Sequence, residues 1–407
     1  MLNVVSAQEA SVCIAENIQS VAQQQCIDLP SALGRVLAED IVSKENIPPF
    51  DRSSVDGFAL SATDTYGCSQ DLPSVLTLRD DIQMGQYAAT EITTGECARI
   101  RTGGMLPKGA NACVMHEYCE EIGDGSVYIC KPIAFHENCI LKGDDISQGQ
   151  CLVKKGTVIT SGIIGQMAAL GISNPHVFRK LRVGILSTGD ELVPYYDSPR
   201  EGCIRDINSL LLQGIVAQHN ADVKLYPIVR DNPTLLEEAV LDAISESDMV
   251  LISGGSSAGD KDASIGVLEK IGHVLFHGIA IKPGKPTIFA TVDSKPVFSL
   301  PGHPLAAALV CHVFVIPALY SMMNAQYKQI ELFARTHENI PSNHGREEIV
   351  PVSLYNVENS LFLKPLYSKS GVISVLQKAD GYIRIARNCE GINKNTDVKV
   401  YLFSRPL

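Results

Sequence analysis

The sequence predicts an α/β plus β multidomain protein: a doubly wound, mostly parallel α/β sheet domain, β-rich N-terminal domains and a small C-terminal β-barrel-like domain. Three observations predict this class. Residues 181–327 alternate strand-like apolar runs with helical patterns, which is typical of parallel sheets covered by helices. Residues 25–180 are rich in Gly, Pro and Thr with short β-type runs, and residues 328–407 return to short strands. A chain of 407 residues is long enough for two to four such domains.

The N-terminal part begins with a helix and continues as short strands. Apolar residues such as Val5, Val12 and Ile18 are separated by polar ones over residues 1–24, and this spacing predicts a helix. Strands are expected over residues 74–78, 98–102, 112–115 and 127–129, because turn signals punctuate these apolar runs. One further helix is expected over residues 160–170.

The central and C-terminal parts follow in order. Strands of the α/β domain are expected over residues 181–186, 223–229, 249–252, 274–281 and 297–300, with helices between them over residues 207–219, 235–245 and 264–271. Asn232 and Pro233 suit the start of the second helix. Short C-terminal strands are expected over residues 349–354, 361–365, 382–386 and 397–403.

Composition and charge exclude several classes of protein. A net charge of −11 argues against a nucleic-acid binder, which needs Lys and Arg for phosphates. No membrane span is expected, because the most apolar stretch, residues 305–320, contains His312 and Pro317. The start of the chain has no export signal, so we expect a cytoplasmic protein. The twelve cysteines form no CxxC pair, and Gly-x-Ser-x-Gly and GxGxxG motifs are lacking, which disfavours thiolate metal centres, triad hydrolysis and nicotinamide chemistry.

Polar loops follow all five expected strands of the α/β domain. Because the carboxyl ends of parallel strands meet at one edge of a sheet, we expect these loops to converge where doubly wound folds bind ligands. The loops comprise residues 187–191, 230–232, 253–262, 282–286 and 301–304. Each loop alone is also compatible with an ordinary turn, a helix cap or solvated surface charges. Five such loops in succession favour a ligand site.

The contents of these loops indicate an anionic ligand. Their glycines permit close backbone approach, and free N–H groups at a helix start can hold a phosphate. Lys282 and Lys285, on a loop with two prolines, supply fixed positive charges. Hard oxygen ligands suited to Mg²⁺ are supplied by Asp190, Glu191, Asp231, Asp260 and Asp262. Carboxylates for a metal and lysines for an anion on one rim predict a site for a phosphoanhydride.

These segments together resemble the molybdopterin molybdenumtransferases of the MoeA type, which include the E domain of gephyrin and its plant counterpart. The matching motifs occur in the family's order over nearly the whole chain. They are PFD…DGFA at residues 49–59, RTG at 101–103, GDDI at 143–146, STGDEL at 187–192, SGG…G…D at 253–262, IKPGKP at 281–286 and LPGHP at 300–304.

The resemblance implies a domain organisation and a reaction. Its domains would be an α/β domain of residues 1–24 and 181–327, a linking and dimerisation domain of 25–47 and 148–180, a β-rich domain of 48–147, and a C-terminal domain of 328–407. It implies a homodimer whose active sites each combine the α/β domain of one subunit with the β-rich domain of its partner. The implied reaction inserts molybdenum from molybdate into adenylated molybdopterin with Mg²⁺ and releases AMP. A molybdopterin adenylyltransferase would act upstream.

The resemblance also implies roles for individual residues. Catalytic roles fall to Asp56, Thr102, Asp145, Glu191, Asp231 and Asp262. Metal ligands would be Asp190, Glu191, Asp231 and Asp262. Substrate or anion contacts fall to Ser187, Gly189, Gly254, Gly255, Ser257, Lys282, Lys285, Pro301, His303, Arg346 and Ser370.

The sequence departs from the family pattern at a few positions, and these keep alternatives open. His303 stands where the family usually has Asn, and Ile140 and Leu141 stand where it usually has arginines. Loss of an anion-facing arginine is compatible with a different oxyanion, tungstate, or with a catalytically weak binding or scaffold paralogue. A third reading is the preceding adenylylation step, whose enzyme has a similar α/β domain but would not need the other regions.

Overall fold

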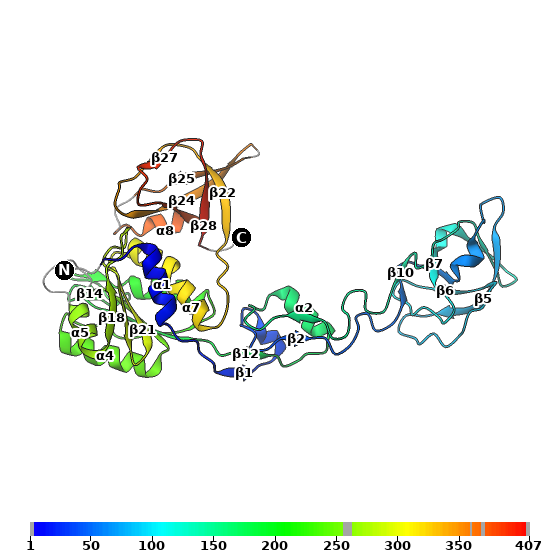
Figure 1. Ribbon diagram of the computed structural model, residues 1–407, viewed down its shortest axis with the longest axis horizontal. Helices are drawn as coiled ribbons and strands as arrows, with labels where there is room; N and C mark the ends of the chain where they lie inside the picture. Colours follow the sequence, from blue (N-terminus) through cyan, green and yellow to red (C-terminus); the bar gives the residue numbers. More distant parts are fainter. Residues whose placement is uncertain (1–3, 255–262, 359, 368–370, 404–407) are drawn as a thin grey trace. The chain divides into compact units, whose positions relative to one another are not determined.

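The computed structural model describes residues 4–254, 263–358, 360–367 and 371–403. The chain divides into two compact units. One comprises residues 1–38, 156–160 and 175–407, and the other residues 39–155 and 161–174. Figure 1 shows the α/β and C-terminal domains of the first unit and the β-rich part of the second.

A six-stranded sheet forms the centre of the first unit, in the order β16-β13-β17-β21-β20-β18. Strands β16, β13, β17 and β21 are parallel neighbours, while β20 is antiparallel to both β21 and β18. Their bounds are β13 Arg182–Ser187, β16 Asp222–Leu225, β17 Met249–Ser253, β18 His273–His277, β20 Ile288–Val292 and β21 Lys295–Leu300. The predicted doubly wound, mostly parallel α/β sheet is confirmed.

Helices cover both faces of this sheet because side chains alternate along its buried strands. Val183 and Ile185 contribute to a core with α1, α3, α6 and α7, whereas Leu186 joins a second core with α4 and α5. The helix bounds are α1 Ala7–Asn17, α3 Asn208–Ala217, α4 Pro233–Glu246, α5 Ala263–Ile271, α6 Pro304–Val310 and α7 Ile316–Met322. Ser6 caps α1 in a capping box with Glu9, and Asn232 caps α4 as its sequence predicts.

One continuous helical stretch lies deepest in this domain. Residues Pro304–Met322 run through α6, the π-helical turn η4 (Cys311–Val315) and α7 without a break. The wide turn precedes Pro317, which lacks the N–H of a regular helix. Among the described residues this is the one helix long and apolar enough to cross a membrane, with mean hydropathy 2.0, and 83% of its most apolar window is buried inside the fold.

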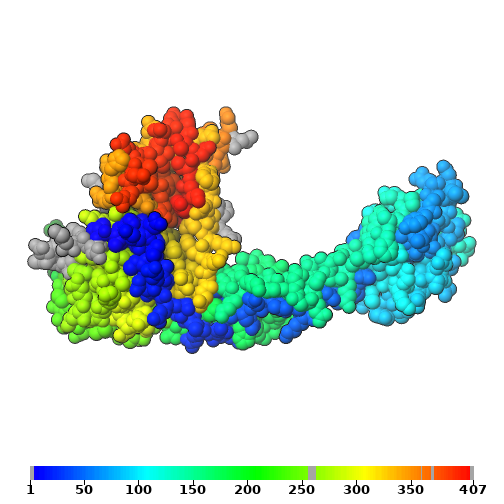
Figure 2. Space-filling model, in the orientation of Figure 1, coloured from blue at the N-terminus to red at the C-terminus, as the bar shows by residue number. Residues whose placement is uncertain are grey.

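The C-terminal domain is a small closed barrel of five strands. The order β24-β25-β22-β28-β26 closes through pairing of β26 with β24. The barrel strands are β22 Glu331–Thr336, β24 Glu347–Val357, β25 Ser360–Pro365, β26 Gly381–Ile385 and β28 Asp397–Leu402, and the short elements beside them are β23 Ile340–Pro341, β27 Gly391–Ile392 and α8 Ser374–Lys378. Figure 2 shows this domain, in orange and red, lying against the green and yellow α/β domain.

The second unit is mainly β. Its six-stranded sheet has the order β7-β4-β6-β5-β9-β8, and two further strand pairs, β3–β10 and β2–β11, lead to it. The elements are β2 Ile41–Val42, β3 Arg52–Ser53, β4 Gly57–Leu60, η2 Ala62–Thr65, β5 Ser74–Ile82, β6 Glu96–Ile100, β7 Ala112–Met115, η3 His116–Tyr118, β8 Cys119–Ile122, β9 Ser126–Ile129, β10 Cys139–Ile140, β11 Cys151–Val153 and α2 Ser161–Ala169. In the first unit, β1 (Gln24–Cys26) pairs with β12 (His176–Phe178), followed by η1 (Leu29–Ala32).

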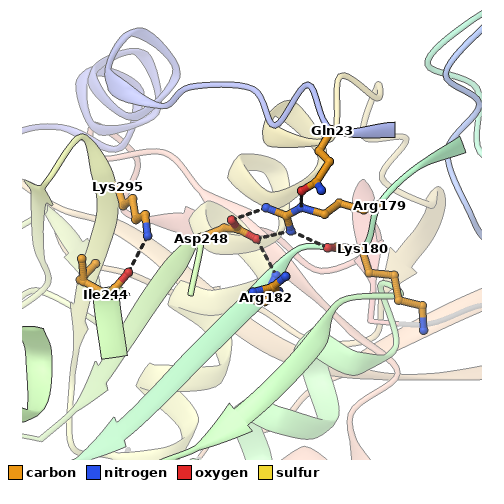
Figure 3. Close-up of polar contacts among 7 residues, drawn as sticks. All are labelled: Gln23, Arg179, Lys180, Arg182, Ile244, Asp248 and Lys295. Atoms are coloured by element: carbon orange, nitrogen blue, oxygen red, sulfur yellow. Dashed lines mark hydrogen bonds and ion pairs between the residues drawn. The ribbon is translucent and has the colours of Figure 1, made fainter. Parts of the chain in front are cut away.

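A nearly buried ion pair fixes this β1–β12 extension to the α/β domain. The Arg179 guanidinium donates to both carboxylate oxygens of Asp248 at 2.6 Å and to Gln23 Oε1 at 2.7 Å (Figure 3). The Arg182 N–H also donates to Asp248. Burial raises the pKa of Asp248, but the bonds from Arg179 and Arg182 outweigh it and hold the pKa below its ordinary value.

We expect Asp248→Ala to lower the free energy of unfolding by about 3 kcal/mol, because it leaves a desolvated guanidinium without its partner. Urea denaturation measures this loss. The matched control is Asp397→Ala, which breaks a similar two-bond pair with Arg335 at side chains that are 45% and 58% exposed. That control should lose less than about 1 kcal/mol. Because the folded pKa of Asp248 is lowered, its contribution is present near neutral pH and disappears as pH falls through that lowered pKa. Equal losses in both variants would contradict this assignment.

Candidate functional site

The loops after the parallel strands are tied together at the carboxyl edge of the sheet. Thr188, the first residue after β13, donates its N–H to the Ser253 carbonyl at the end of β17 at 2.9 Å. The Gly189 N–H donates to the Val229 carbonyl at 3.1 Å, which joins the same loop to the segment after β16. These two contacts bring the segments after β13 and β16 together with the end of β17, as predicted for these three of the five loops.

The loops after β17 and β21 meet this edge through side-chain bonds from Asn208 and one close backbone approach. Asn208, at the start of α3, donates its amide to Ser253 Oγ at 2.8 Å and to the Gly302 carbonyl at 2.7 Å. Gly254 has φ +102°, and a Cβ there would lie 2.2 Å from the Thr188 carbonyl oxygen. A glycine is required at this position because any side chain would collide with fixed backbone. Asn208 was not among the predicted site residues.

Two of the predicted metal ligands lie side by side at this edge. The Asp190 N–H donates to Asp231 Oδ2 and the Asp231 N–H donates to Asp190 Oδ1, both at 3.4 Å. Thr188 Oγ1 donates to Asp231 Oδ1 at 3.0 Å, and Arg230 donates to the Asp190 carbonyl at 3.0 Å. Both aspartates are exposed. The arrangement fixes two carboxylates through backbone contacts while leaving them open to solvent.

These carboxylates fit the way Mg²⁺ is usually held. Mg²⁺ commonly binds through one or two carboxylates and completes its shell with water and substrate phosphates. Across the described residues there is no preformed group of three His, Cys, Asp or Glu side chains that could hold a metal. Glu191 is exposed in the same loop, with its carboxylate against Gly189, where an added Cβ would lie 2.8 Å from Glu191 Oε2. The donor set therefore suits a metal that arrives with an anionic substrate.

Five other predicted residues line one cavity of about 500 Å³ between the α/β domain and the C-terminal barrel. They are Lys282, Lys285, Pro301, His303 and Arg346. The remaining wall is mostly apolar and includes Ile349, Pro351 and Leu366, with Tyr367 beside them. A cavity of this size and mixed lining suits a small ring-containing anion.

The strand that leads into the loop of Lys282 and Lys285 differs from the sequence prediction. The prediction of a single strand over residues 274–281 is wrong. β18 ends at His277, and Ile281–Lys282 forms a separate strand, β19. β19 pairs in parallel with β24 of the C-terminal barrel. Gly278, at φ +114°, turns the chain between the two strands, and both are apolar enough to look like one run. β20 (Ile288–Val292) was also not predicted.

In the second unit, two of the predicted residues are in direct contact. The Thr102 N–H donates to Asp56 Oδ1 at 2.7 Å and the Thr102 hydroxyl at 3.0 Å. These two bonds hold the pKa of Asp56 below its ordinary value, so this carboxylate stays ionised at neutral pH. Asp145 donates its N–H to the Ile47 carbonyl at 3.1 Å in a neighbouring loop.

One other predicted residue is buried and so is poorly placed to contact a ligand, and several lie outside the described residues. Ser187 is buried at the end of β13, and within the described structure its hydroxyl has no hydrogen-bond partner. Gly255, Ser257, Asp262 and Ser370 lie outside the described residues, as does Asp260. Glu348 also lines the cavity of Lys282, and no motif singled it out because it lies within a regular strand, β24.

Three family models together match most of the chain. Residues 5–171 match the MoeA N-terminal region (domain I and II), residues 184–321 a probable molybdopterin binding domain, and residues 334–403 the MoeA C-terminal region (domain IV). A putative molybdopterin biosynthesis protein of Methanocaldococcus jannaschii is 37% identical over 92% of this chain and 91% of its own length. A molybdopterin molybdenumtransferase of Staphylococcus epidermidis is 30% identical over 96% of this chain and 95% of its own length. The crystal structure of a molybdopterin biosynthesis MoeA protein of Pyrococcus horikoshii matches with TM-score 0.87 and 33% identity, over 98% of this chain and all of that one.

Proposed function

This chain belongs to the MoeA family of molybdopterin molybdenumtransferases, which act in molybdenum cofactor biosynthesis, and from that membership we propose how it inserts the metal. The substrates are molybdate and adenylated molybdopterin. Water cleaves the phosphoanhydride bond of the adenylated pterin, which releases AMP and leaves the pterin phosphate. The two dithiolene sulfurs bind molybdenum, and their thiol protons leave with one molybdate oxygen as water. The reaction depends on Mg²⁺.

The observation that carries this proposal is the pairing of Asp190 with Asp231 where the strand-end loops converge. In our proposal these two carboxylates and Glu191 hold Mg²⁺, which neutralises charge on the pyrophosphate oxygens when bound. Thr188 fixes Asp231 through its hydroxyl.

The cavity lined by Lys282, Lys285 and Arg346 supplies the other half of the site. Lys282 and Lys285 are the anion-binding groups, and fixed positive charges of this kind stabilise a tetrahedral oxyanion. Arg346 and His303 line the same cavity, and we assign to this wall the contacts with the pterin end. The apolar lining excludes water from part of the ring system.

Asp56, Thr102 and Asp145 complete the site in this proposal. They belong to a compact unit distinct from the one that carries Asp231 and Lys285. We propose that the protein is a homodimer and that these residues serve the active site of the partner subunit. An ionised Asp56 can accept hydrogen bonds from donor groups of the pterin substrate. We further propose a cytoplasmic location and an upstream molybdopterin adenylyltransferase, because that reaction class must supply the adenylated substrate.

The deciding experiment is AMP release from adenylated molybdopterin, measured with and without Mg²⁺ and with molybdate or tungstate added in turn. We expect release that requires both Mg²⁺ and molybdate, and that stops when EDTA removes the metal. Sulfate serves as the control oxyanion.

Two results would replace this proposal. Release that depends on tungstate alone would assign the other metal to this enzyme. Tight binding of the adenylated pterin with no release under either oxyanion would identify a binding or scaffold protein.

A further inference from the structure

One carboxylate lies among the basic groups of the cavity. Glu348 Oε1 is 2.8 Å from Lys282 Nζ. The contact joins the two walls of the cavity, because Lys282 belongs to β19 and Glu348 to β24. Register places the two residues directly opposite each other, and the Glu347 N–H donates to the Ala280 carbonyl at 2.9 Å beside them. The ion pair therefore follows from backbone pairing rather than from a chance surface contact.

The two partners differ in how firmly they are held. The Glu348 side chain is only 15% exposed, and its second oxygen accepts a hydrogen bond from Ser342 Oγ at 2.8 Å. The Lys282 side chain is 49% exposed. The carboxylate is thus the fixed member of the pair, and the flexible lysine is the member with solvent-accessible space in which to turn toward a ligand.

The charges that line the cavity show how the Lys282–Glu348 pair affects the binding of an anion. Among the described lining residues, the basic side chains of Lys282, Lys285 and Arg346 face one acidic side chain, Glu348. Like charges repel, so an oxyanion entering the cavity meets an unfavourable interaction with Glu348. It must also compete with Glu348 for the ammonium of Lys282.

We propose that Glu348 is a counter-ion that sets the oxyanion affinity of this cavity by competing with the incoming oxyanion for Lys282. The carboxylate keeps the empty cavity from holding abundant anions tightly and limits retention of bound oxyanion. This inference rests on the proposed function, because it takes the cavity to be the oxyanion site. It adds a residue that acts through Lys282, as a positioning residue.

The test measures binding of inorganic molybdate, and separately of sulfate, by calorimetric titration of the full-length protein. Glu348→Gln removes the charge but keeps the size and an acceptor oxygen. We expect it to tighten molybdate and sulfate binding about tenfold, the change for one favourable interaction of about 1.4 kcal/mol. In turnover the KM for molybdate should fall without any increase in kcat.

A thermodynamic cycle separates this role from a general structural one. In a Lys282→Ala background, Glu348→Gln should tighten binding by much less than tenfold, because the residue it competes for is gone. The matched control is Glu347→Gln: this neighbouring carboxylate pairs with Arg384 and does not line the cavity. The control should leave molybdate affinity unchanged, and melting temperatures verify that each variant is folded.

Unchanged or weaker binding in folded Glu348→Gln would overturn the inference, and so would a full tenfold gain that persists without Lys282. Wild-type protein that binds no oxyanion by titration would overturn it as well. These outcomes are separable from the proposed function, because AMP release by the wild type is measured independently. Release that requires molybdate, together with an unaffected Glu348→Gln variant, would retain the proposed enzyme and remove only the role of Glu348.

Discussion

Replacing Asp231 with asparagine is expected to lower the rate of Mg²⁺- and molybdate-dependent AMP release by about 100-fold or more, the scale of losing one charged group that stabilises a transition state. Asp231 is held by Thr188 Oγ1 at 3.0 Å and by the Asp190 N–H at 3.4 Å. Asparagine keeps the size of the side chain and one acceptor oxygen but removes the negative charge. The loss should therefore be accompanied by a higher Mg²⁺ concentration at half-maximal rate.

The control for this prediction is Asp242→Asn, which removes another exposed carboxylate, on helix α4. It should keep the wild-type rate and the wild-type Mg²⁺ dependence. Because Asp231 is exposed at a loop, neither variant should change the melting temperature by more than a degree or two. A wild-type rate in Asp231→Asn would remove this residue from the site.

Much of the α/β domain could be predicted because its central strands, such as β13, β17 and β21, are buried on both faces. Residues 249–252 form an uninterrupted apolar run, and the helix expected over 235–245 is found as Pro233–Glu246. Strand β20 was not predicted because it is defined by antiparallel pairing with β18 and β21. This pairing depends on the tertiary fold and leaves no local sequence pattern. The same reason explains β19, whose partner β24 is distant in sequence.

The candidate site was predictable where polar loops follow the apolar runs of the parallel sheet. Thr188, Asp190 and Asp231 meet because parallel strands end at the same edge of the sheet. Asn208 and Glu348 could not be found in this way. Asn208 acts from the start of a helix, and Glu348 is an ordinary polar residue of a strand until β19 brings Lys282 against it.

Asp56 and Asp231 lie in different compact units of the chain, and our proposal assigns them to one active site that combines two subunits. Asp56→Asn should also lower AMP release by about 100-fold, because Asp56 is an ionised group ordered by two hydrogen bonds from Thr102. The homodimers of Asp56→Asn and of Asp231→Asn are therefore both expected to be nearly inactive.

Mixed dimers distinguish a shared site from one built within a single subunit. Co-expression with two different affinity tags allows a dimer of one Asp56→Asn subunit and one Asp231→Asn subunit to be isolated. If sites are shared, one of its two sites is intact and the other carries both changes, so about half of the wild-type rate returns. If each site is built within one subunit, both sites carry a defect and the mixed dimer stays inactive.

The reciprocal mixed dimer supplies the control, because it contains the same two substitutions in the other arrangement. A wild-type subunit is paired with a subunit that carries both Asp56→Asn and Asp231→Asn. In a shared-site dimer each site then has one defect, and activity should be lost. In a dimer with separate sites the wild-type subunit would retain about half of the rate. Opposite results in the two mixed dimers cannot come from poor folding or subunit dissociation, since both contain the same substitutions. Activity in the reciprocal dimer alone, or a protein that stays monomeric at assay concentration, would contradict the shared site.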